Sequence, residues 1–90
     1  MSLRRSRLDI QLEVLNAVRD GVDKPTRIMY AANMSWNPVR KILDSLVDGG
    51  LLSMTSTAVG NRSKKRYEIT EKGISVLNYF EGAKELVDLR

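Results

Sequence analysis

Residues 33–50, NMSWNPVRKILDSLVDGG, contain the beginning, the buried face and the end of one predicted helix. Ser35 is expected to cap the amides of its first turn. Pro38 lies within that turn, where a missing amide hydrogen is harmless. Gly49-Gly50 then provides the left-handed residue that commonly ends a helix. The sequence therefore predicts a helix over residues 35–49.

This helix has two different faces. Its apolar residues recur at the spacing of one helical face, as expected for packing on a core: Val39, Leu43, Leu46 and Val47, with Ile42 beside them. The opposite face carries polar, aromatic and charged side chains: Trp36, Asn37, Arg40, Lys41 and Asp44. A helix that reads nucleic acid needs such a pair of faces, but a solvated surface helix has them too. The neighbouring segments must distinguish the two interpretations.

Composition excludes several classes of function. The 90 residues include no Cys and no His, which excludes disulfides, thiolate chemistry, zinc sites built on these residues and histidine acid–base catalysis. The acidic residues are scattered, and no Gly-rich phosphate loop precedes a helix. We therefore expect no enzyme, no metal site and no cofactor. No apolar run reaches the roughly 20 residues of a membrane span, so we expect a cytoplasmic, nucleoid-associated protein without membrane contact.

Positive charge is concentrated in the first part of the chain. The net charge is +4 and the pI is near 9.7, which favours polyanionic partners. Residues 1–70 hold 12 basic and 7 acidic side chains, whereas residues 71–90 hold 3 basic and 4 acidic ones. The positive charge therefore belongs to the part that contains the candidate reading helix.

Two more helices are predicted before residue 35. Pro25 suits the first turn of a helix over about 25–33, and a connection of about three residues to the next helix is typical of a helix-turn-helix. Asn33 is expected to supply a left-handed turn residue. A first helix over about 6–20 begins with Ser6 and Asp9 at the spacing of a capping box. One face of that helix carries its apolar residues: Leu8, Leu12, Leu15 and Val18.

A β-hairpin is predicted over about 51–69. Its first strand is rich in small polar and β-branched residues, Gly60-Asn61 is a two-residue turn signal, and Tyr67 and Ile69 share one face of the return strand. Four cations fall within five residues of the tip and return strand: Arg62, Lys64, Lys65 and Arg66. These charges repel one another and are not expected to contribute to folding. A partner anion explains them better than a role in solubility.

The last segment is predicted to form a helix that is capped by Thr70 and continues to the C-terminus. Ile74 and Leu77 are expected to reach back to the domain. Other apolar residues step at heptad spacing, flanked by Tyr79 and Leu86: Val76, Phe80, Ala83 and Val87. Because about 20 residues form a rod of about 30 Å, these groups need a cover. The cover is either the helix's own domain or, as we favour, the same helix of a second subunit in a C₂ dimer.

Together these elements predict a winged helix-turn-helix, mainly α with a small β-hairpin (α+β). Residues 1–70 would form the domain, and residues 71–90 a dimerisation helix. Residues 26–35, TRIMYAANMS, resemble the helix-turn segment of small archaeal winged-helix proteins, the ten-kilodalton DNA-binding type. Residues 67–73, YEITEKG, followed by Leu77, are similar to that family's entry into its C-terminal helix.

The resemblance covers residues 6 to about 88. It implies a homodimer, joined by an antiparallel coiled coil of the C-terminal helices, that binds double-stranded DNA as a transcriptional regulator or chromatin-associated protein. The hairpin of this chain is longer and more basic than the family pattern, and its terminal helix is rather short.

The predicted DNA contacts follow from this arrangement. Asn37 and Arg40 lie one turn apart near the start of helix 35–49 and are the candidates for adenine and guanine edges. Phosphate contacts are expected from polar residues on either side: Thr26, Arg27, Ser35 and Lys41. Trp36 either lies against the sugar-phosphate backbone or packs on the second helix. The four hairpin cations would follow the backbone or enter the minor groove.

A second class of function fits the same fold. Winged-helix domains also serve as protein-interaction scaffolds, and a fold alone does not assign a function. In that case the outward face of helix 35–49 would contact a protein. An exposed Trp36 beside Met34 would suit such a surface, whereas the cationic hairpin suits DNA.

Overall fold

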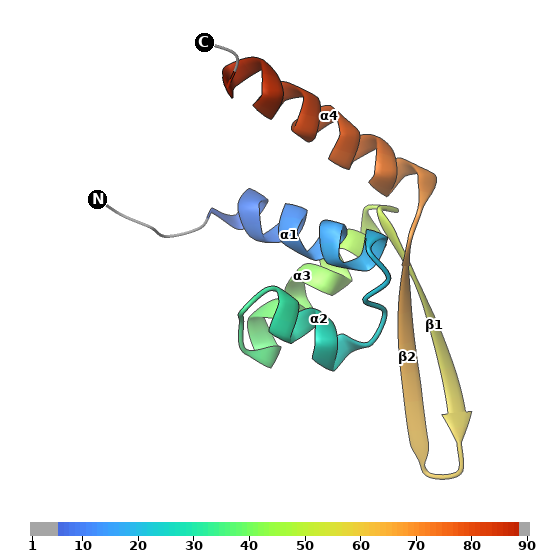
Figure 1. The fold of residues 1–90 in the computed structure, drawn as a ribbon. Helices are drawn as coiled ribbons and strands as arrows, with labels where there is room; N and C mark the ends of the chain where they lie inside the picture. The colour runs from blue at the N-terminus through green and yellow to red at the C-terminus, as the bar shows by residue number, and fades with distance from the viewer. Residues whose placement is uncertain (1–5, 89–90) are drawn as a thin grey trace.

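The computed structural model describes the backbone of residues 6–88, with the side chains in this range except those of 59, 63 and 84–88. The described elements are, in order, α1 (Arg7–Arg19), α2 (Pro25–Ala31), α3 (Trp36–Asp48), β1 (Leu52–Val59), β2 (Arg62–Ile69) and α4 (Glu71–Asp88). The first three helices pack together, the antiparallel hairpin projects to one side, and α4 extends on the far side of α1 from α2 (Figure 1). The predicted α+β winged helix-turn-helix is confirmed.

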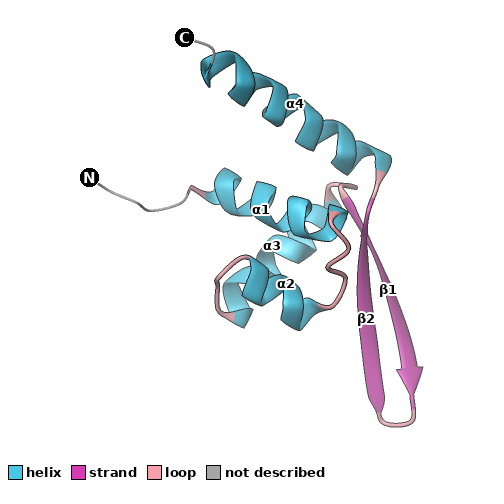
Figure 2. Cartoon of the chain, viewed as in Figure 1, coloured by secondary structure: helices cyan, strands magenta, loops and turns pink. Residues whose placement is uncertain are grey.

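One hydrophobic core joins all these elements. Its buried side chains come from every helix and from the base of the hairpin: Leu15, Ile28, Leu43, Leu52, Tyr67 and Leu77. Fully burying a large apolar side chain contributes about 1.5–3 kcal/mol, so this cluster is the main stabilising feature. The outer part of the hairpin stands clear of the helices (Figure 2). Its described side chains are exposed and are therefore open to a partner.

Local signals account for several element boundaries. The Asp9 amide donates to the Ser6 hydroxyl and the Ser6 amide donates to the Asp9 carboxylate, both at 3.0 Å, which confirms the capping box. Asn33 has the predicted left-handed backbone, with φ of 53°. Helix α3 ends at Asp48, and Gly50 has φ of 78°. Each of these signals acts between residues that are close in sequence.

Two expected core residues are partly exposed instead. Leu8 is 43% exposed, because α1 contributes to the core through its later turns, at Val14, Leu15 and Val18. In α4, Leu77 is only 1% exposed, as predicted, whereas Ile74 is 39% exposed. Gly73 and Leu77 form the line along which α4 contacts the domain, and Ile74 is turned by about 100° from Gly73 on the helix.

A compact joint connects the beginning of α4 to the end of α3. The Thr70 hydroxyl accepts a hydrogen bond from the Gly73 amide at 3.1 Å, as the predicted cap requires, and donates to the Gly50 carbonyl at 2.6 Å. The Lys72 ammonium donates to the Gly49 carbonyl at 2.8 Å. Gly73 leaves no room for a Cβ, which would collide with the Leu51 carbonyl. These contacts fix the origin of α4 relative to the base of the hairpin.

Candidate nucleic-acid interface

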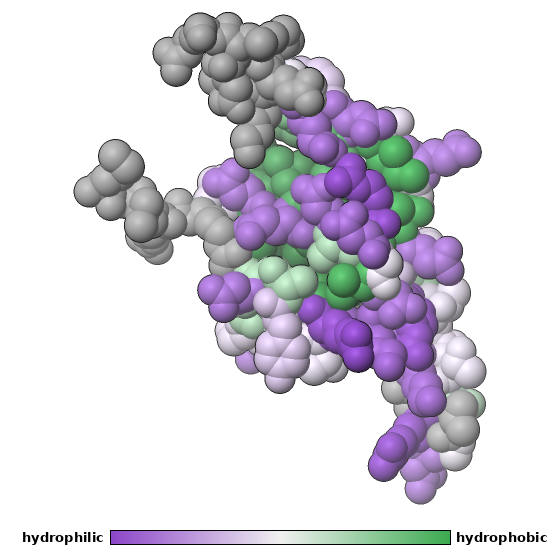
Figure 3. All heavy atoms as spheres, in the orientation of Figure 1, coloured by the Kyte–Doolittle hydropathy of each residue, from purple (hydrophilic) through white to green (hydrophobic). Residues whose placement is uncertain are grey.

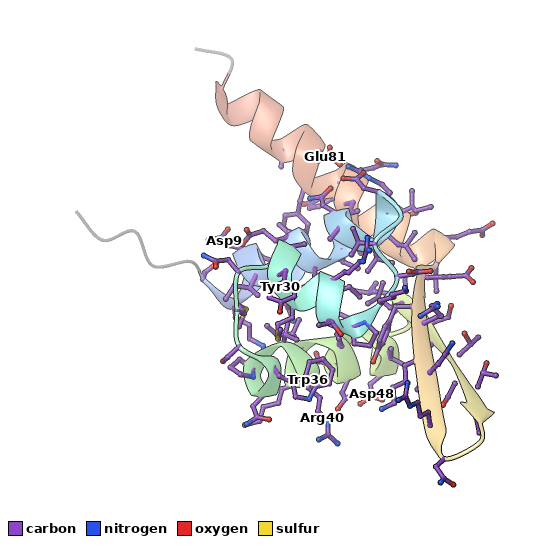
Figure 4. All side chains as sticks on the ribbon, turned by 60° about the horizontal axis from the view of Figure 1, so that its bottom comes forward. Asp9, Tyr30, Trp36, Arg40, Asp48 and Glu81 are labelled. Atoms are coloured by element: carbon purple, nitrogen blue, oxygen red, sulfur yellow. The ribbon has the colours of Figure 1, made fainter. Side chains whose placement is uncertain are left out.

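Helix α3 presents its polar face away from the core. Val39 and Leu43 are fully buried, which turns Asn37, Arg40 and Lys41 outward, and all three are exposed. The Arg40 side chain reaches away from the protein on the surface formed by α3 (Figure 4). An amide and a guanidinium that are exposed within one helical turn can each form paired hydrogen bonds with a base edge.

The N-terminus of α3 differs from the sequence expectation. Ser35 has the extended backbone of an N-cap (φ −76°, ψ 166°), but its side chain makes no capping hydrogen bond. An N-cap hydroxyl usually accepts from the amide two or three residues later. Pro38, three residues after Ser35, has no amide hydrogen to donate. The predicted Ser35 side-chain cap was therefore wrong, although Ser35 itself lies at the start of α3.

The hairpin divides its four cations between two faces. Side chains alternate along a strand, so Lys65 lies on the same face as Tyr67, which is buried in the core. Arg62, Lys64 and Arg66 lie on the opposite face. A hairpin with cations on both faces can approach phosphates on both of its sides, and the sequence alone had not separated these residues.

Arg66 is partly used within the chain. Its Nε lies 3.7 Å from the Asp23 carboxylate, and the amide of the next residue, Tyr67, donates to the Asp23 carbonyl at 3.0 Å. Arg66 is therefore the hairpin cation for which the structure shows an acidic partner within the chain, among the described residues. An exposed ion pair contributes only about 0–1 kcal/mol. Together with the backbone bond, it holds the loop before α2 against the edge of β2.

Tyr67 also relates the hairpin to the outward face of α3. Burial raises the pKa of its phenol, the Asp44 carboxylate raises it further, and the Arg40 guanidinium acts in the opposite direction. The phenol therefore stays protonated at neutral pH. Because Asp44 and Arg40 both act on it, the base of the hairpin lies near the middle of α3.

A groove, which we call the α2–β2 groove, lies between α2, the start of α3 and β2. Its volume is about 620 Å³, and its lining comprises Lys24, Pro25, Thr26, Met29, Trp36, Lys64, Lys65 and Arg66. The structure thus brings Thr26, Trp36 and three of the four hairpin cations around one groove, which includes residues from both faces of β2. Arg27 is exposed in the first turn of α2 but does not line the groove.

The sequence reasoning did not assign Lys24 and Met29 to this surface. Lys24 is a single cation in a loop, and Met29 has the spacing of a core residue in α2. Trp36 is 38% exposed and lies at the edge of the groove. Strongly hydrophilic residues cover much of the hairpin (Figure 3). The groove can therefore be recognised only in the folded structure, because the residues that line it come from segments far apart in the sequence.

The predicted dimerisation surface of α4 is only partly covered by its own domain. Val76 is half-buried against the core. Tyr79 is 71% exposed and makes an edge-to-face contact with the half-buried Phe80, with ring centroids 5.2 Å apart. Ala83 is exposed as well. The side chains of Leu86 and Val87 lie outside the described residues.

An ion pair connects α4 to α1. The Arg19 guanidinium donates to the Glu81 carboxylate at 2.7 Å. Hydrophobic surface is visible between the two helices (Figure 3).

Over the described residues, 6–88, no group of three or more acidic side chains is arranged to hold a metal ion. No helix in that range is long and apolar enough to cross a bilayer.

These features define a winged helix-turn-helix protein, and comparison with known proteins agrees. The winged helix-turn-helix family model matches residues 4–88, so the chain belongs to that family. Protein MJ0287 of the archaeon Methanocaldococcus jannaschii is 33% identical over 70 residues, which are 78% of this chain and 64% of that protein. The chain therefore spans less than two thirds of this relative's length.

Solved structures show the same fold. Sso10a-2, a DNA-binding protein from Sulfolobus solfataricus, has a TM-score of 0.74 and 27% sequence identity, over 93% of this chain and 83% of that chain. The protein smu.1704 from Streptococcus mutans has a TM-score of 0.81 and 22% identity, over 99% of this chain and 88% of that chain. The resemblance to small archaeal winged-helix DNA-binding proteins is confirmed.

Proposed function

We propose that this chain is a non-enzymatic, homodimeric protein that binds double-stranded DNA and regulates transcription. The observation that carries the proposal is the combination of an outward polar face on α3 with a long basic hairpin beside it. The description of Sso10a-2 as a DNA-binding protein supports it. Such a protein would act in the cytoplasm, on the nucleoid.

In this proposal α3 enters the major groove. Asn37 and Arg40 contact base edges, and Lys41 binds a phosphate on one side. Thr26 and Arg27, in the first turn of α2, bind the backbone on the other side, and Ser35 and Trp36 lie at the entry of α3. The hairpin follows the backbone or enters the minor groove. Because its cations lie on both faces, the minor groove, which has a phosphate wall on each side, suits it well.

The dimer is proposed to form through α4. Tyr79, Phe80 and Ala83 would pack against the same residues of a second copy, with Val76 at one end of the contact and Leu86 and Val87 at the other. The exposure of Tyr79 and Ala83 in the single chain supports this assignment. In that arrangement residues 1–70 are the DNA-binding part and residues 71–90 the dimerisation helix.

A protein-interaction module is the second candidate. The observation in its favour is the presence of two exposed aromatic side chains, Tyr30, which is 72% exposed, and Trp36, which is 38% exposed. Tyrosine and tryptophan are common anchors of protein–protein contacts. This function would need no cationic hairpin, so the two candidates differ in their dependence on salt.

Fluorescence-anisotropy titration of a labelled random-sequence duplex at several salt concentrations tests the proposal. If each subunit makes roughly five phosphate contacts, log K should fall against log[salt] with a slope of about −4 to −5 per subunit. Changing Arg62, Lys64 and Lys65 to Gln should reduce the slope by about 3 per subunit, because each lost contact removes about 0.9. Arg66 is left intact, since it pairs with Asp23.

The control is Arg7→Gln, which removes one positive charge from α1 and should leave the slope unchanged. No binding of the duplex at low salt would contradict the proposal and favour the protein-interaction module. Binding that ignores salt and tolerates the hairpin substitutions would contradict it as well.

A further inference from the structure

The outer edge of β1 is open. Within the described residues, 6–88, the sheet has two strands, so β1 pairs with β2 on one side and has no strand partner on the other. β2 is the strand toward α2, and β1 lies on the far side of it (Figure 2). The side chains of residues 53–58 are exposed. Every second residue of an antiparallel strand directs its N–H and C=O groups away from its partner, so β1 offers these groups to a further strand.

β1 has none of the features that usually block an exposed edge. Proteins protect such edges with charged side chains, Pro or a β-bulge. The sequence of β1, LSMTSTAV, contains no charged residue and no Pro. Its register with β2 runs without a bulge from Leu52, opposite Ile69, to Val59, opposite Arg62. The charged residues of the hairpin lie on β2 instead. An edge of this kind is typical of a strand that pairs with another chain.

The sequence of β1 is complementary to itself. When two copies of β1 run antiparallel with Ser56 opposite Ser56, Met54 of one copy faces Ala58 of the other, and Thr55 faces Thr57. Apolar side chains then meet apolar ones and hydroxyl groups meet hydroxyl groups, and such cross-strand pairs stabilise a sheet. A second copy of this chain is therefore the partner that fits the edge.

Pairing through β1 also keeps the cations apart. In the resulting sheet the two β1 strands lie in the middle and the two β2 strands are outermost, three strand spacings or about 14 Å from each other. This distance exceeds the Debye length of about 10 Å at 0.1 M salt, so repulsion between the two β2 strands is largely screened. Lys64 and Lys65 remain exposed for a polyanion.

We propose that the hairpins of two copies pair through β1, antiparallel about Ser56, into a four-stranded sheet. The pairing itself depends only on β1. Its use rests on the DNA-binding function proposed above. Helix α4 and the hairpin lie at opposite ends of the molecule (Figure 1), so one subunit can pair through both at the same time. Pairing through β1 then connects neighbouring dimers on one duplex and makes their binding cooperative.

Disulfide cross-linking of the full chain tests this register. The chain has no Cys, so Ser56→Cys introduces one thiol per copy. Residues directly opposite each other on antiparallel strands have Cα atoms about 4.5–5.5 Å apart, which a disulfide can span. Ala58→Cys is the matched control on the same face of the same strand. In the proposed sheet, residues 58 of the two copies would lie at least about 13 Å apart, four residues along the strand.

Under mild oxidation of the free protein, we expect Ser56→Cys to cross-link about tenfold faster than Ala58→Cys, because only the first change brings two thiols within bonding distance. Non-reducing gel electrophoresis measures both rates. A mixture of Met54→Cys and Ala58→Cys should cross-link faster than either variant alone, since these residues face each other across the two copies. Equal rates for Ser56→Cys and Ala58→Cys overturn the proposal, and so does a mixture that is no faster than its components.

A duplex long enough for several dimers should increase the pairing. Relative to free protein at about 0.1 mM, an effective concentration in the millimolar range between neighbours should raise the Ser56→Cys rate by about tenfold. A duplex that holds one dimer should not. If the protein binds the long duplex without any increase, the cooperative part is wrong and the pairing stands. If it binds no duplex at all, the DNA-binding function fails, while the rates in the free protein still decide the pairing.

Discussion

Arg40 and Lys41 are adjacent on the exposed face of α3, but their side chains offer different chemistry. The guanidinium of Arg40 can donate two parallel hydrogen bonds to a guanine edge, whereas the ammonium of Lys41 acts as a point charge toward a phosphate. Arg66, another cation of the same surface, is partly neutralised by Asp23. In the proposed complex, residue type therefore assigns a base contact to Arg40 and a phosphate contact to Lys41, whereas Arg66 pairs within the chain.

Replacing Arg40 by Ala tests whether this side chain contacts a base. At a duplex selected from a random pool, we expect a loss of about 1–3 kcal/mol in binding free energy, and a smaller loss on random duplex. Lys41→Ala is the matched comparison and should weaken binding to both duplexes by a similar factor, because phosphate contacts carry no base information. Equal losses for Arg40→Ala on the two duplexes would mean that Arg40 contacts only the backbone.

At the scale of elements, the position of α4 depends on how closely its first turn approaches the hairpin base. The Thr70 and Lys72 side chains bind carbonyls of residues 49–51 at the end of α3 and just before β1. Gly73 allows the helix to come close because it has no Cβ. The end of α3, the base of the hairpin and the start of α4 therefore behave as one joint.

Gly73→Ala should destabilise the protein. The added Cβ would meet the Leu51 carbonyl and the Ile69 side chain. Overpacking costs about 1–3 kcal/mol and is offset by about 1 kcal/mol from removing a helical glycine, so we expect a net loss of up to about 2 kcal/mol in the free energy of unfolding. Urea denaturation at one fixed protein concentration measures it.

Gly82→Ala is the control for this prediction. Gly82 lies in the same helix, and a Cβ there would meet no atom within 4 Å. This change should stabilise the protein by up to about 1 kcal/mol. If both substitutions stabilise the protein by the same amount, the close approach at Gly73 does not limit α4.

A long helix, α4, lies at one end of the molecule, and the basic hairpin projects at the other (Figure 1). Tyr79, in the middle of α4, is 71% exposed. In a C₂ dimer built on α4, two hairpins and two α3 helices would be available to one duplex. Because counterion release grows with the number of phosphate contacts, the dimer would bind DNA far more tightly than a single subunit.

Tyr79→Glu tests the proposed dimer. Tyr79 is mostly exposed in the single chain, so the substitution should leave the fold intact, while a charge within an apolar interface should separate the subunits. Sedimentation should show the mass of a monomer, with unchanged far-UV circular dichroism. Asn78→Glu adds the same charge on another face of α4 and should leave the dimer intact. An unchanged mass for Tyr79→Glu would assign dimerisation, if present, to another surface.

The order and type of the elements were predictable because their signals are local. The capping box at Ser6, the left-handed Asn33 and the apolar stripe of α3 each involve residues within a few turns of one another. The same reasoning missed the effect of Pro38 on the Ser35 cap, although the information was available in the sequence. The candidate site was predicted in part: the cations and Trp36 were identified as residues, but their grouping around one groove was not.

The sequence by itself therefore determined the winged helix-turn-helix and the polar face of its third helix, because backbone caps, turn residues and hydrophobic periodicity act over short separations. Only the tertiary structure decided that Leu8 and Ile74 are exposed, that Arg66 pairs with Asp23, and that α2 and β2 form a cationic groove around Trp36. Burial, ion pairing and grooves depend on which distant segments meet: Tyr67 of β2 enters the core, and its amide bonds to the carbonyl of Asp23, just before α2.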